Sequence, residues 1–252
     1  MDRQRISAAA ASIREADSVV AMTGAGVSTA SGIPDFRSED GIWTKYDPND
    51  FHISRFRADP EGFWRERIEM VEEAFRGDVE PNPAHEALAE LEAADCLGTL
   101  ITQNVDGLHQ AAGSDDPIEI HGNGQRAVCT DCGRQYDIDP VMERVKDGDV
   151  PPICDHCNGI LKPDTVLFGE SLPRDDLLRA QTAARNADVF LAIGSSLTVE
   201  PAASLPRRAM DRGGALLIVN LERTDLSDRA TYDFRADVTE LLPALADAVV
   251  EG

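Results

Sequence analysis

Short apolar runs alternate with amphipathic segments along most of this 252-residue chain. The apolar runs have the length and composition of strands buried on both faces of a parallel sheet. They lie at 18–22, 97–102, 166–168, 189–193 and 215–219. The amphipathic segments, with apolar residues at helical spacing, lie at 2–17, 84–95, 175–186 and 202–212. The alternation predicts an α/β fold: a Rossmann-like parallel sheet with helices on both faces.

Two stretches depart from this alternation. Residues 38–82 combine helical pieces, loop residues and most of the large aromatic side chains, whereas residues 124–163 contain four of the five cysteines. We expect both to be insertions that together build a smaller lobe. The predicted larger domain then comprises 1–37, 83–123 and 164–252, with 38–82 as a helical insertion and 124–163 as a cysteine module.

The four cysteines of that module form two closely spaced pairs. Cys129-x2-Cys132 is followed, after 21 intervening residues, by Cys154-x2-Cys157. Each pair places two sulfurs on one tight turn, and two such turns supply the tetrahedral thiolate set that zinc prefers. The alternatives are a redox pair, two disulfides, or His156 in place of one cysteine. Because four thiolates leave no open position for a substrate, we expect one structural zinc ion per chain.

A glycine-rich turn follows the first predicted strand. The sequence Gly24-Ala25-Gly26-Val27-Ser28 precedes a predicted helix, and in that context backbone N–H groups can cradle a pyrophosphate. The third glycine of G-x-G-x-x-G is absent, so a purely structural turn is the alternative. Shortly afterwards, Phe36 can cover a flat ring and Arg37 suits bidentate recognition of phosphate.

Polar residues also follow two later strands. Gln103, Asn104 and Asp106 come where the strand at 97–102 ends, and open α/β sheets bind ligands at that edge. Asp106 is alternatively a cap for the next helix. His121 ends an apolar–polar stretch and precedes a glycine, a position from which an imidazole can act as a base near neutral pH.

Taken together, these motifs resemble those of the sirtuins, which are NAD-dependent protein-lysine deacylases. The likeness extends over about residues 5–245 and includes the four cysteines. Its other motifs, in order, are GAGVS at 24–28, SGIPDFR at 31–37, TQNVD at 102–106, HG at 121–122, FGE at 168–170, GSSL at 194–197 and VN at 219–220.

The resemblance implies a set of NAD contacts. The phosphates, the ribose and the nicotinamide side would be held by Gly24, Ala25, Gly26, Ser28, Phe36 and Arg37. The pocket for the nicotinamide carboxamide would be lined by Ile33 and Asp35. The nicotinamide ribose and nearby water would be ordered by Gln103, Asn104 and Asp106. The adenosine half would be surrounded by Gly194, Ser195, Ser196, Asn220, Leu221, Glu222 and Val238.

The resemblance also implies the reaction. His121 would be the general base, with Asn104 and Asp106 beside it, and NAD would be consumed as a co-substrate. An acylated-lysine protein would bind as an extended strand between the lobes. Its groove would be lined by Val166, Phe168, Gly169 and Glu170. The implied products are nicotinamide, free lysine and O-acyl-ADP-ribose.

Other activities remain open at this point. A dehydrogenase is disfavoured because no acidic residue ends a second strand about 20 residues after the glycines. ADP-ribosyl transfer to protein and a non-catalytic NAD- or zinc-binding module are further alternatives.

The acyl preference can also be judged from the resemblance. Sirtuins that prefer succinyl or malonyl lysine carry Tyr and Arg three apart on a small-lobe helix. With Trp64 as the anchor, the corresponding positions are Arg67 and Met70, so the pair is absent and an uncharged acyl group is favoured, although a shifted Arg65 or Arg67 could serve.

The composition indicates which partners, location and source to expect. The chain has 46 acidic and 24 basic residues, a formal net charge of −22, and only three of the basic residues are lysines. So negative a surface repels nucleic-acid phosphates and anionic lipid, and we expect neither partner. With no long apolar run and no leader-like segment, we predict a cytoplasmic protein. The acidic excess with scarce lysine indicates a high-salt source, and we expect an archaeon.

The charge generates a prediction about salt. Repulsion among unscreened carboxylates should weaken the folded state at low ionic strength. The Debye length falls from about 10 Å at 0.1 M to about 3 Å at 1 M, so molar salt removes most of this repulsion. Melting temperature and enzymatic activity should therefore both rise between 0.1 M and molar KCl. An activity optimum near 0.1 M, with the circular dichroism spectrum intact there, would contradict a high-salt origin.

Overall fold

A six-stranded parallel sheet forms the centre of the larger lobe in the computed structural model, which describes residues 2–36, 38, 41–74 and 79–252. The strand order is β3-β2-β1-β7-β8-β9. The strands are β1 (Val19–Thr23), β2 (Thr99–Thr102), β3 (Ile118–Glu119), β7 (Val189–Ile193), β8 (Ala215–Val219) and β9 (Tyr232–Phe234). The chain builds outward from β1 to β3, then returns to place β7 on the other side of β1, which is the strand order of a dinucleotide-binding Rossmann fold.

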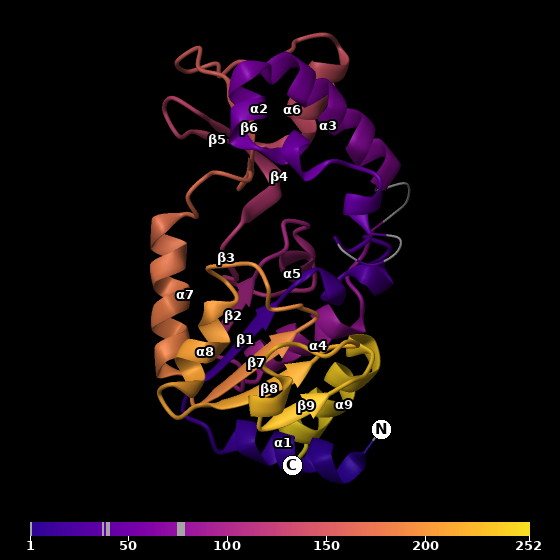
Figure 1. The fold of residues 1–252 in the computed structure, drawn as a ribbon, viewed down its shortest axis with the longest axis vertical. Helices are drawn as coiled ribbons and strands as arrows, with labels where there is room; N and C mark the ends of the chain where they lie inside the picture. The colour runs from indigo at the N-terminus through magenta and orange to yellow at the C-terminus, as the bar shows by residue number, and fades with distance from the viewer. Residues whose placement is uncertain (1, 37, 39–40, 75–78) are drawn as a thin grey trace.

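Helices cover both faces of this sheet (Figure 1). One face packs against α1 (Arg3–Arg14), α4 (Pro83–Ala93) and α9 (Val238–Val250), and the other against α7 (Arg174–Asn186) and α8 (Ser204–Met210). Each face has its own apolar cluster, because β1, β7 and β8 are buried on both sides. The predicted fold class is confirmed.

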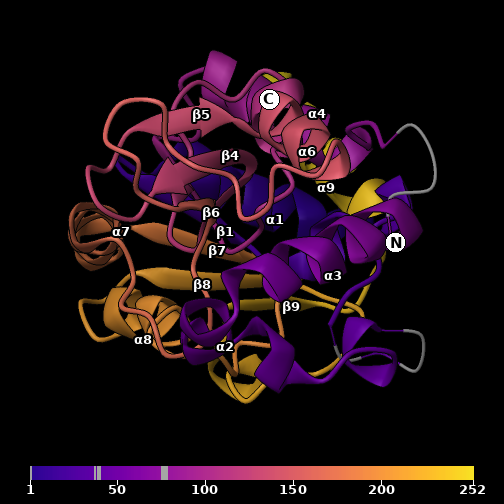
Figure 2. The same cartoon turned by 90° about the horizontal axis from the view of Figure 1, so that it is seen from above.

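The smaller lobe lies above the carboxyl edge of the sheet (Figure 1), and the view from above shows its elements lying over part of the sheet (Figure 2). Its elements are α2 (Ile53–Ala58), α3 (Pro60–Ala74), α6 (Ile138–Lys146) and an antiparallel sheet of β5 (Gln135–Asp137), β4 (Gly122–Cys129) and β6 (Leu161–Thr165). The two sequence insertions share one core, in which the fully buried Trp64 of α3 donates from Nε1 to the Leu161 carbonyl of β6 at 2.8 Å.

Short elements complete the chain. They are α5 (Leu108–Ala111) and the 3-10 turns η1 (Ala25–Val27), η2 (Thr29–Ser31), η3 (Ile42–Thr44), η4 (Pro48–Phe51) and η5 (Ser227–Arg229). Within the described ranges, no helix has the length and apolar character needed to cross a membrane.

Three secondary-structure expectations were wrong or incomplete. Residues 166–168 form no strand of the parallel sheet, because this segment crosses between the lobes and bonds to residues of the small lobe. The glycine-rich turn leads into no α-helix: it contains the 3-10 turn η1 and is followed by the 3-10 turn η2, and its backbone at Gly24 and Gly26 packs closely on Gly194. The pattern also missed β9 and α9, although Asp237 marks the helix start by accepting a hydrogen bond from Thr239 N at 2.8 Å.

Candidate active site and metal centre

The predicted polar residues gather at the carboxyl edge of the parallel sheet, facing the small lobe. They stand on the loops that follow five of its strands. Gly24 to Ser28 follow β1, Gln103 to Asp106 follow β2 and His121 follows β3. Gly194 to Ser196 follow β7, and Asn220 to Glu222 follow β8. Parallel strands bring their carboxyl ends to one edge, so residues far apart in sequence become neighbours.

Three glycines meet where the loops after β1 and β7 cross. A Cβ on Gly24 would lie 2.8 Å from the Gly194 carbonyl oxygen, and one on Gly26 would lie 2.9 Å from the Gly194 Cα. Gly194 itself has φ of +57°, and its Cβ would meet Val27 N at 2.4 Å. The two loops therefore pack backbone to backbone, and larger residues at these positions would push the loops apart. The loops meet where the strand order reverses, which is the point at which such sheets bind dinucleotides.

Ser28 is the centre of a buried hydrogen-bond network beneath this turn. Its hydroxyl donates to Asp106 Oδ2 at 2.8 Å and accepts from Asn104 Nδ2 at 3.0 Å. His85 Nδ1 accepts from Asn82 N, so its Nε2 carries the proton and donates to Ser28 Oγ at 3.3 Å. All the bonding capacity of the hydroxyl is used, which fixes the loops after β1 and β2 relative to each other.

Asp106 makes the helix-start contact that the sequence offered as one alternative, and it also bonds to Ser28. Its Oδ2 accepts from Ser28, while its Oδ1 accepts from Leu108 N at 3.0 Å at the start of α5. The second contact satisfies a free N–H group of the helix start. One carboxylate thus both anchors the network and supports the helix.

A second buried histidine extends the network. His109 Nε2 lies 2.9 Å from Thr23 Oγ1, and the Thr23 hydroxyl donates to Thr102 Oγ1 at 2.9 Å. The rings of His85 and His109 are 4.9 Å apart. Burial lowers the pKa of His85, against an opposing effect of Asp106, and burial with a smaller effect of His85 lowers the pKa of His109 to about 3. Both imidazoles are therefore neutral near pH 7.

His121 is oriented by the backbone. Its Nδ1 lies 2.9 Å from the carbonyl oxygen of Gln103, and since a carbonyl can only accept, Nδ1 carries the proton. In the neutral ring Nε2 then keeps a lone pair that can take up a proton. Burial lowers the pKa of His121, although the Gln103 hydrogen bond opposes this, so the neutral form prevails near pH 7.

Gln103 connects the end of its own strand, β2, to the ends of three others. Its side chain donates from Nε2 to the Thr23 carbonyl at 3.2 Å and to Ser195 Oγ at 3.0 Å, while its own carbonyl accepts from His121. The loops after β1, β2, β3 and β7 are therefore tied together by one residue.

The loop at 33–36 leads toward the small lobe. Asp35 Oδ1 accepts from Ser38 N at 2.8 Å, and the partly exposed ring of Phe36 lies 5.2 Å from that of Trp43. Trp43 in turn packs on Phe51 and Phe168. Ile33 lies on the same loop, half-buried, and Arg37 lies outside the described residues.

The segment that contains the predicted peptide contacts runs between the lobes. Val166 N donates to the His121 carbonyl at 2.8 Å, and Phe168 exchanges backbone bonds with Phe51 and Ile53, both at 2.9 Å. The Phe168 ring is 47% exposed, which leaves it free to contact a ligand. Gly169 has φ of +81°, and a Cβ there would lie 2.5 Å from the His52 imidazole.

The predicted adenosine contacts differ in exposure. Leu221 is 69% exposed, a position that suits contact with a flat ring, and Asn220 folds back to donate to the Glu222 carbonyl at 2.9 Å. Val238 starts α9 and is 6% exposed within the core of the large lobe. Packing alone accounts for its burial.

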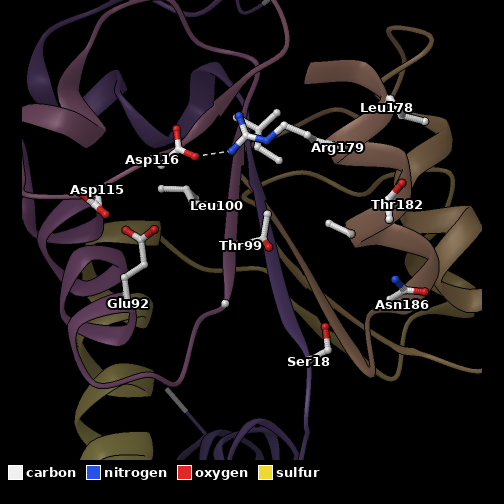
Figure 3. Close-up of a pocket in the computed structure, with 13 residues that line it drawn as sticks. Ser18, Glu92, Thr99, Leu100, Asp115, Asp116, Leu178, Arg179, Thr182 and Asn186 are labelled. Carbon is white, nitrogen blue, oxygen red and sulfur yellow. Dashed lines mark hydrogen bonds and ion pairs between the residues drawn. The ribbon is translucent and has the colours of Figure 1, made fainter. Parts of the chain in front are cut away.

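A cavity in the described part lies away from these residues. It measures about 640 Å³ and opens beside the amino end of β2, between α4 and α7 (Figure 3). Glu92, Asp115 and Asp116 stand on one side of it, and Asp116 pairs with Arg179 from α7. None of the predicted site residues lines this cavity.

The four cysteines converge as the spacing predicted. Their Sγ atoms all lie within 4.8 Å of one another, with Cys129 and Cys157 at 3.4 Å and Cys132 and Cys154 at 3.8 Å. A tetrahedral zinc ion with Zn–S bonds of about 2.3 Å requires sulfurs about 3.8 Å apart. These separations exceed a disulfide bond of about 2.05 Å, so the donor set fits zinc and not two disulfides.

Backbone turns produce this geometry. Gly133 N donates to the Cys129 carbonyl and Asn158 N to the Cys154 carbonyl, both at 3.0 Å. Gly133 and Asn158 have φ of +72° and +64°, and glycine and asparagine are the residues that adopt this conformation most readily. Each pair of cysteines is thus followed by a residue suited to close the turn.

The sequence reading missed the histidines of the buried network. His85 and His109 are both buried, and each bonds to the loop after β1 or to β1 itself. One available signal was Asn82-Pro83 followed by His85, which forms a reciprocal cap at the start of α4. Nothing in the sequence pairs His109 with Thr23, since their contact depends on how α5 sits against β1.

This geometry is that of a dinucleotide-binding α/β fold with a four-cysteine lobe, and comparisons with known proteins agree. The model of the Sir2 family matches residues 24–201. An NAD-dependent protein deacetylase of Haloarcula marismortui is 50% identical, over 98% of this chain and 95% of the relative. The chain belongs to the Sir2 family.

Solved structures are similar over nearly the whole chain. A histidine-to-alanine Sir2 variant with deacetylated p53 peptide and 3′-O-acetyl ADP ribose gives a TM-score of 0.87 at 39% identity, covering 96% of this chain and 97% of the other. A Sir2 homologue in complex with NAD gives 0.84 at 39% identity, covering 97% and 93%. NAD as co-substrate and one zinc ion in the four-cysteine site are the cofactors of this chain.

Removal of the metal generates a testable prediction. Cys129→Ser or Cys154→Ser should release zinc, lower the melting temperature of the small lobe and reduce activity indirectly, because the ion joins both cysteine turns. Elemental analysis should find about one zinc per wild-type chain. His156→Ala is the matched control, since this exposed neighbour lies outside the four-sulfur set and its loss should leave zinc content unchanged. A serine variant that is active without metal would contradict a structural zinc.

Proposed function

We propose that this protein removes acetyl groups from protein lysine, using NAD and transferring the acyl group to ADP-ribose. The observation that carries the proposal is His121. Its imidazole is neutral and held in one tautomer, and it stands on the same sheet edge as the glycine-rich switch point. The NAD-dependent deacetylase relatives support this activity.

The chain's own residues can hold the co-substrate at this edge. When bound, NAD supplies an electrophilic ribose carbon once its nicotinamide bond loosens. The glycine turn after β1, the hydroxyls of Ser195 and Ser196 and the amide of Asn220 offer donors for phosphate and ribose oxygens. Ile33, Asp35 and Phe36 would cover the nicotinamide side, and Arg37 would add a phosphate contact.

His121 would act as the general base. With Nδ1–H bonded to the Gln103 carbonyl, Nε2 is the atom that would accept a proton from a ribose hydroxyl. The buried environment keeps the imidazole neutral, and therefore able to accept a proton, at physiological pH. Asn104 and Asp106 would order the ribose and water nearby, held by their bonds to Ser28.

The protein substrate would bind as an extended strand in the gap between the lobes, along the segment at 166–170. The exposed Phe168 ring and the turn at Gly169 support this placement. We further propose that the domain boundaries lie where the sequence analysis set them, because 38–82 and 124–163 supply the shared small-lobe core. The cytoplasmic location stays a prediction.

Replacement of the base tests the assignment. His121→Ala should lower deacetylation by at least the roughly 10²–10⁴-fold typical of a lost general base, with the fold and much of the NAD affinity kept. Nicotinamide exchange should survive better than deacetylation, because the base acts after nicotinamide leaves. Mass spectrometry of an acetylated peptide measures the first rate, and calorimetry measures NAD affinity. Turnover near the wild-type rate in this variant would rule out His121 as the base.

A second candidate substrate is lysine with an acidic acyl group, and Arg67 favours it. Its guanidinium lines a cavity of about 200 Å³ beside Phe51, and its Nε is buried without a hydrogen-bond partner among the described residues. Burial lowers the pKa of Arg67 to about 10, so the side chain is still a cation at pH 7. Its Nη2 lies 3.7 Å from the Cβ position of Gly124, whose N–H donates to the Val105 carbonyl next to Asn104.

Replacement of Arg67 distinguishes a role in binding succinyl-lysine from one in binding acetyl-lysine. If Arg67 binds an acyl carboxylate, Arg67→Met should lower kcat/KM for a succinyl peptide at least tenfold, since a charged hydrogen bond contributes about 1.5–3 kcal/mol. The value for an acetyl peptide should change less than about threefold. Arg65→Met is the matched control, because Arg65 is exposed and pairs only with Glu61 in the described contacts, at 2.8 Å. Wild-type protein that cleaves acetyl but not succinyl peptide would eliminate the second candidate.

A further inference from the structure

Lys162 is a buried ammonium group with three converging acceptors. The residue lies on β6 and is 8% exposed. Its Nζ donates to the Thr165 carbonyl at 2.7 Å, to the Pro163 carbonyl at 2.9 Å and to Glu170 Oε2 at 3.1 Å. The three contacts match the three protons of an ammonium group, so no donor is left unsatisfied.

Glu170 completes the arrangement from the other end of the segment. The same Oε2 atom that pairs with Lys162 also accepts from Leu167 N at 2.7 Å. The carboxylate is therefore turned inward, toward its own chain. Lysine and glutamate together fold residues 163–170 back on β6 and fix the path of the segment between them.

That segment touches the proposed site directly. Val166 N donates to the carbonyl of His121 at 2.8 Å, and Phe168 is bonded to Phe51 and Ile53 of the small lobe. The backbone that would pair with a peptide is thus joined at one end to the base and at the other to the small lobe. A shift of 163–170 would move the peptide groove relative to His121.

The choice of lysine at this position follows from geometry. Of 24 basic residues in the chain, 21 are arginine, so lysine is the exception here. An ammonium group directs three donors from a single nitrogen, whereas guanidinium spreads five N–H groups over a planar fork. Three acceptors around one point therefore fit an ammonium group and not a guanidinium group. Burial lowers the pKa of Lys162, and the adjacent Glu170 charge opposes this.

We propose that Lys162 and Glu170 are positioning residues that set the peptide groove at 163–170 against His121, and thereby control the affinity for the protein substrate. Neither side chain need touch the reacting atoms. The inference rests on the proposed deacetylase function and deepens it, because it separates peptide binding, set by this pair, from NAD binding, set at the glycine turn.

A lysine-to-arginine exchange tests the geometry, with a matched control in the same lobe. Lys162→Arg keeps the positive charge but loses the three hydrogen bonds that converge on one nitrogen. The KM for an acetylated peptide should therefore rise at least tenfold. The NAD dissociation constant should stay within twofold of wild type. Lys146→Arg is the control: Lys146 on α6 pairs with Glu143 at 3.2 Å, far from residues 163–170 in sequence, and both constants should stay within twofold. A wild-type peptide KM in Lys162→Arg would overturn the proposal, as would an equal loss of NAD affinity.

Hydrogen exchange on the ligand-free protein gives a readout that needs no turnover. In Lys162→Arg the Val166 and Leu167 amides should exchange at least tenfold faster, with β4 amides unchanged. Faster exchange throughout the small lobe would overturn the proposal, since it would indicate a merely stabilising role. If wild-type protein proves inactive, the proposed deacetylation fails, while this measurement still decides the positioning role.

Glu170→Gln covers the case in which Lys162→Arg does not fold. Glutamine keeps the shape and an acceptor oxygen but loses the charge that attracts both Lys162 and Leu167 N. Exchange at Leu167 should accelerate several-fold and the peptide KM should rise about three- to tenfold. Unchanged values for both in this variant would also overturn the proposal.

Discussion

The backbone contact between the loops after β1 and β7 is the constraint on which the site depends. Gly24 and Gly26 lie so close to Gly194 that no side chain fits between them. This contact stands at the point where the strand order reverses, and there the carboxyl edge of an open sheet offers a crevice. Because the loops are packed this tightly, donors from β1 and β7 face the same ligand without rearrangement.

Buried polar groups then position the loops from β2 and β3 on that frame. Ser28 uses every bond its hydroxyl can make, and Gln103 reaches from Ser195 to His121. Neutral histidines suit such a network, because a charged imidazole in the same place would be desolvated without adequate compensation. The buried imidazoles of the site thus stay uncharged, and one of them, His121, remains available for a proton.

The small lobe connects the four-cysteine site to the segment that we propose binds the peptide. The four cysteines close the end of the β4–β6 sheet, and Trp64 joins that sheet to α3 through the Leu161 carbonyl. One residue beyond Leu161, Lys162 turns the chain toward the segment that bonds to His121. A structural ion and a buried lysine therefore act on the same strand, the first through the fold of the lobe and the second through the path of residues 163–170.

The sequence by itself determined the parallel sheet, the four-cysteine site and the clustering of polar residues at strand ends. Each of these features depends on residues close together in sequence: β7 and β8 are unbroken apolar runs, and each cysteine pair occupies one turn. Only the tertiary structure decided what the remaining residues do. Three examples depend on contacts between distant segments or on a reversal of the chain. Arg67 lines a cavity, whereas Arg65 is exposed. His109 contacts Thr23, and Glu170 turns toward Lys162. The apolar run at 166–168 wrongly predicts a strand of the parallel sheet, since such a run shows that a segment is buried but not which neighbour buries it.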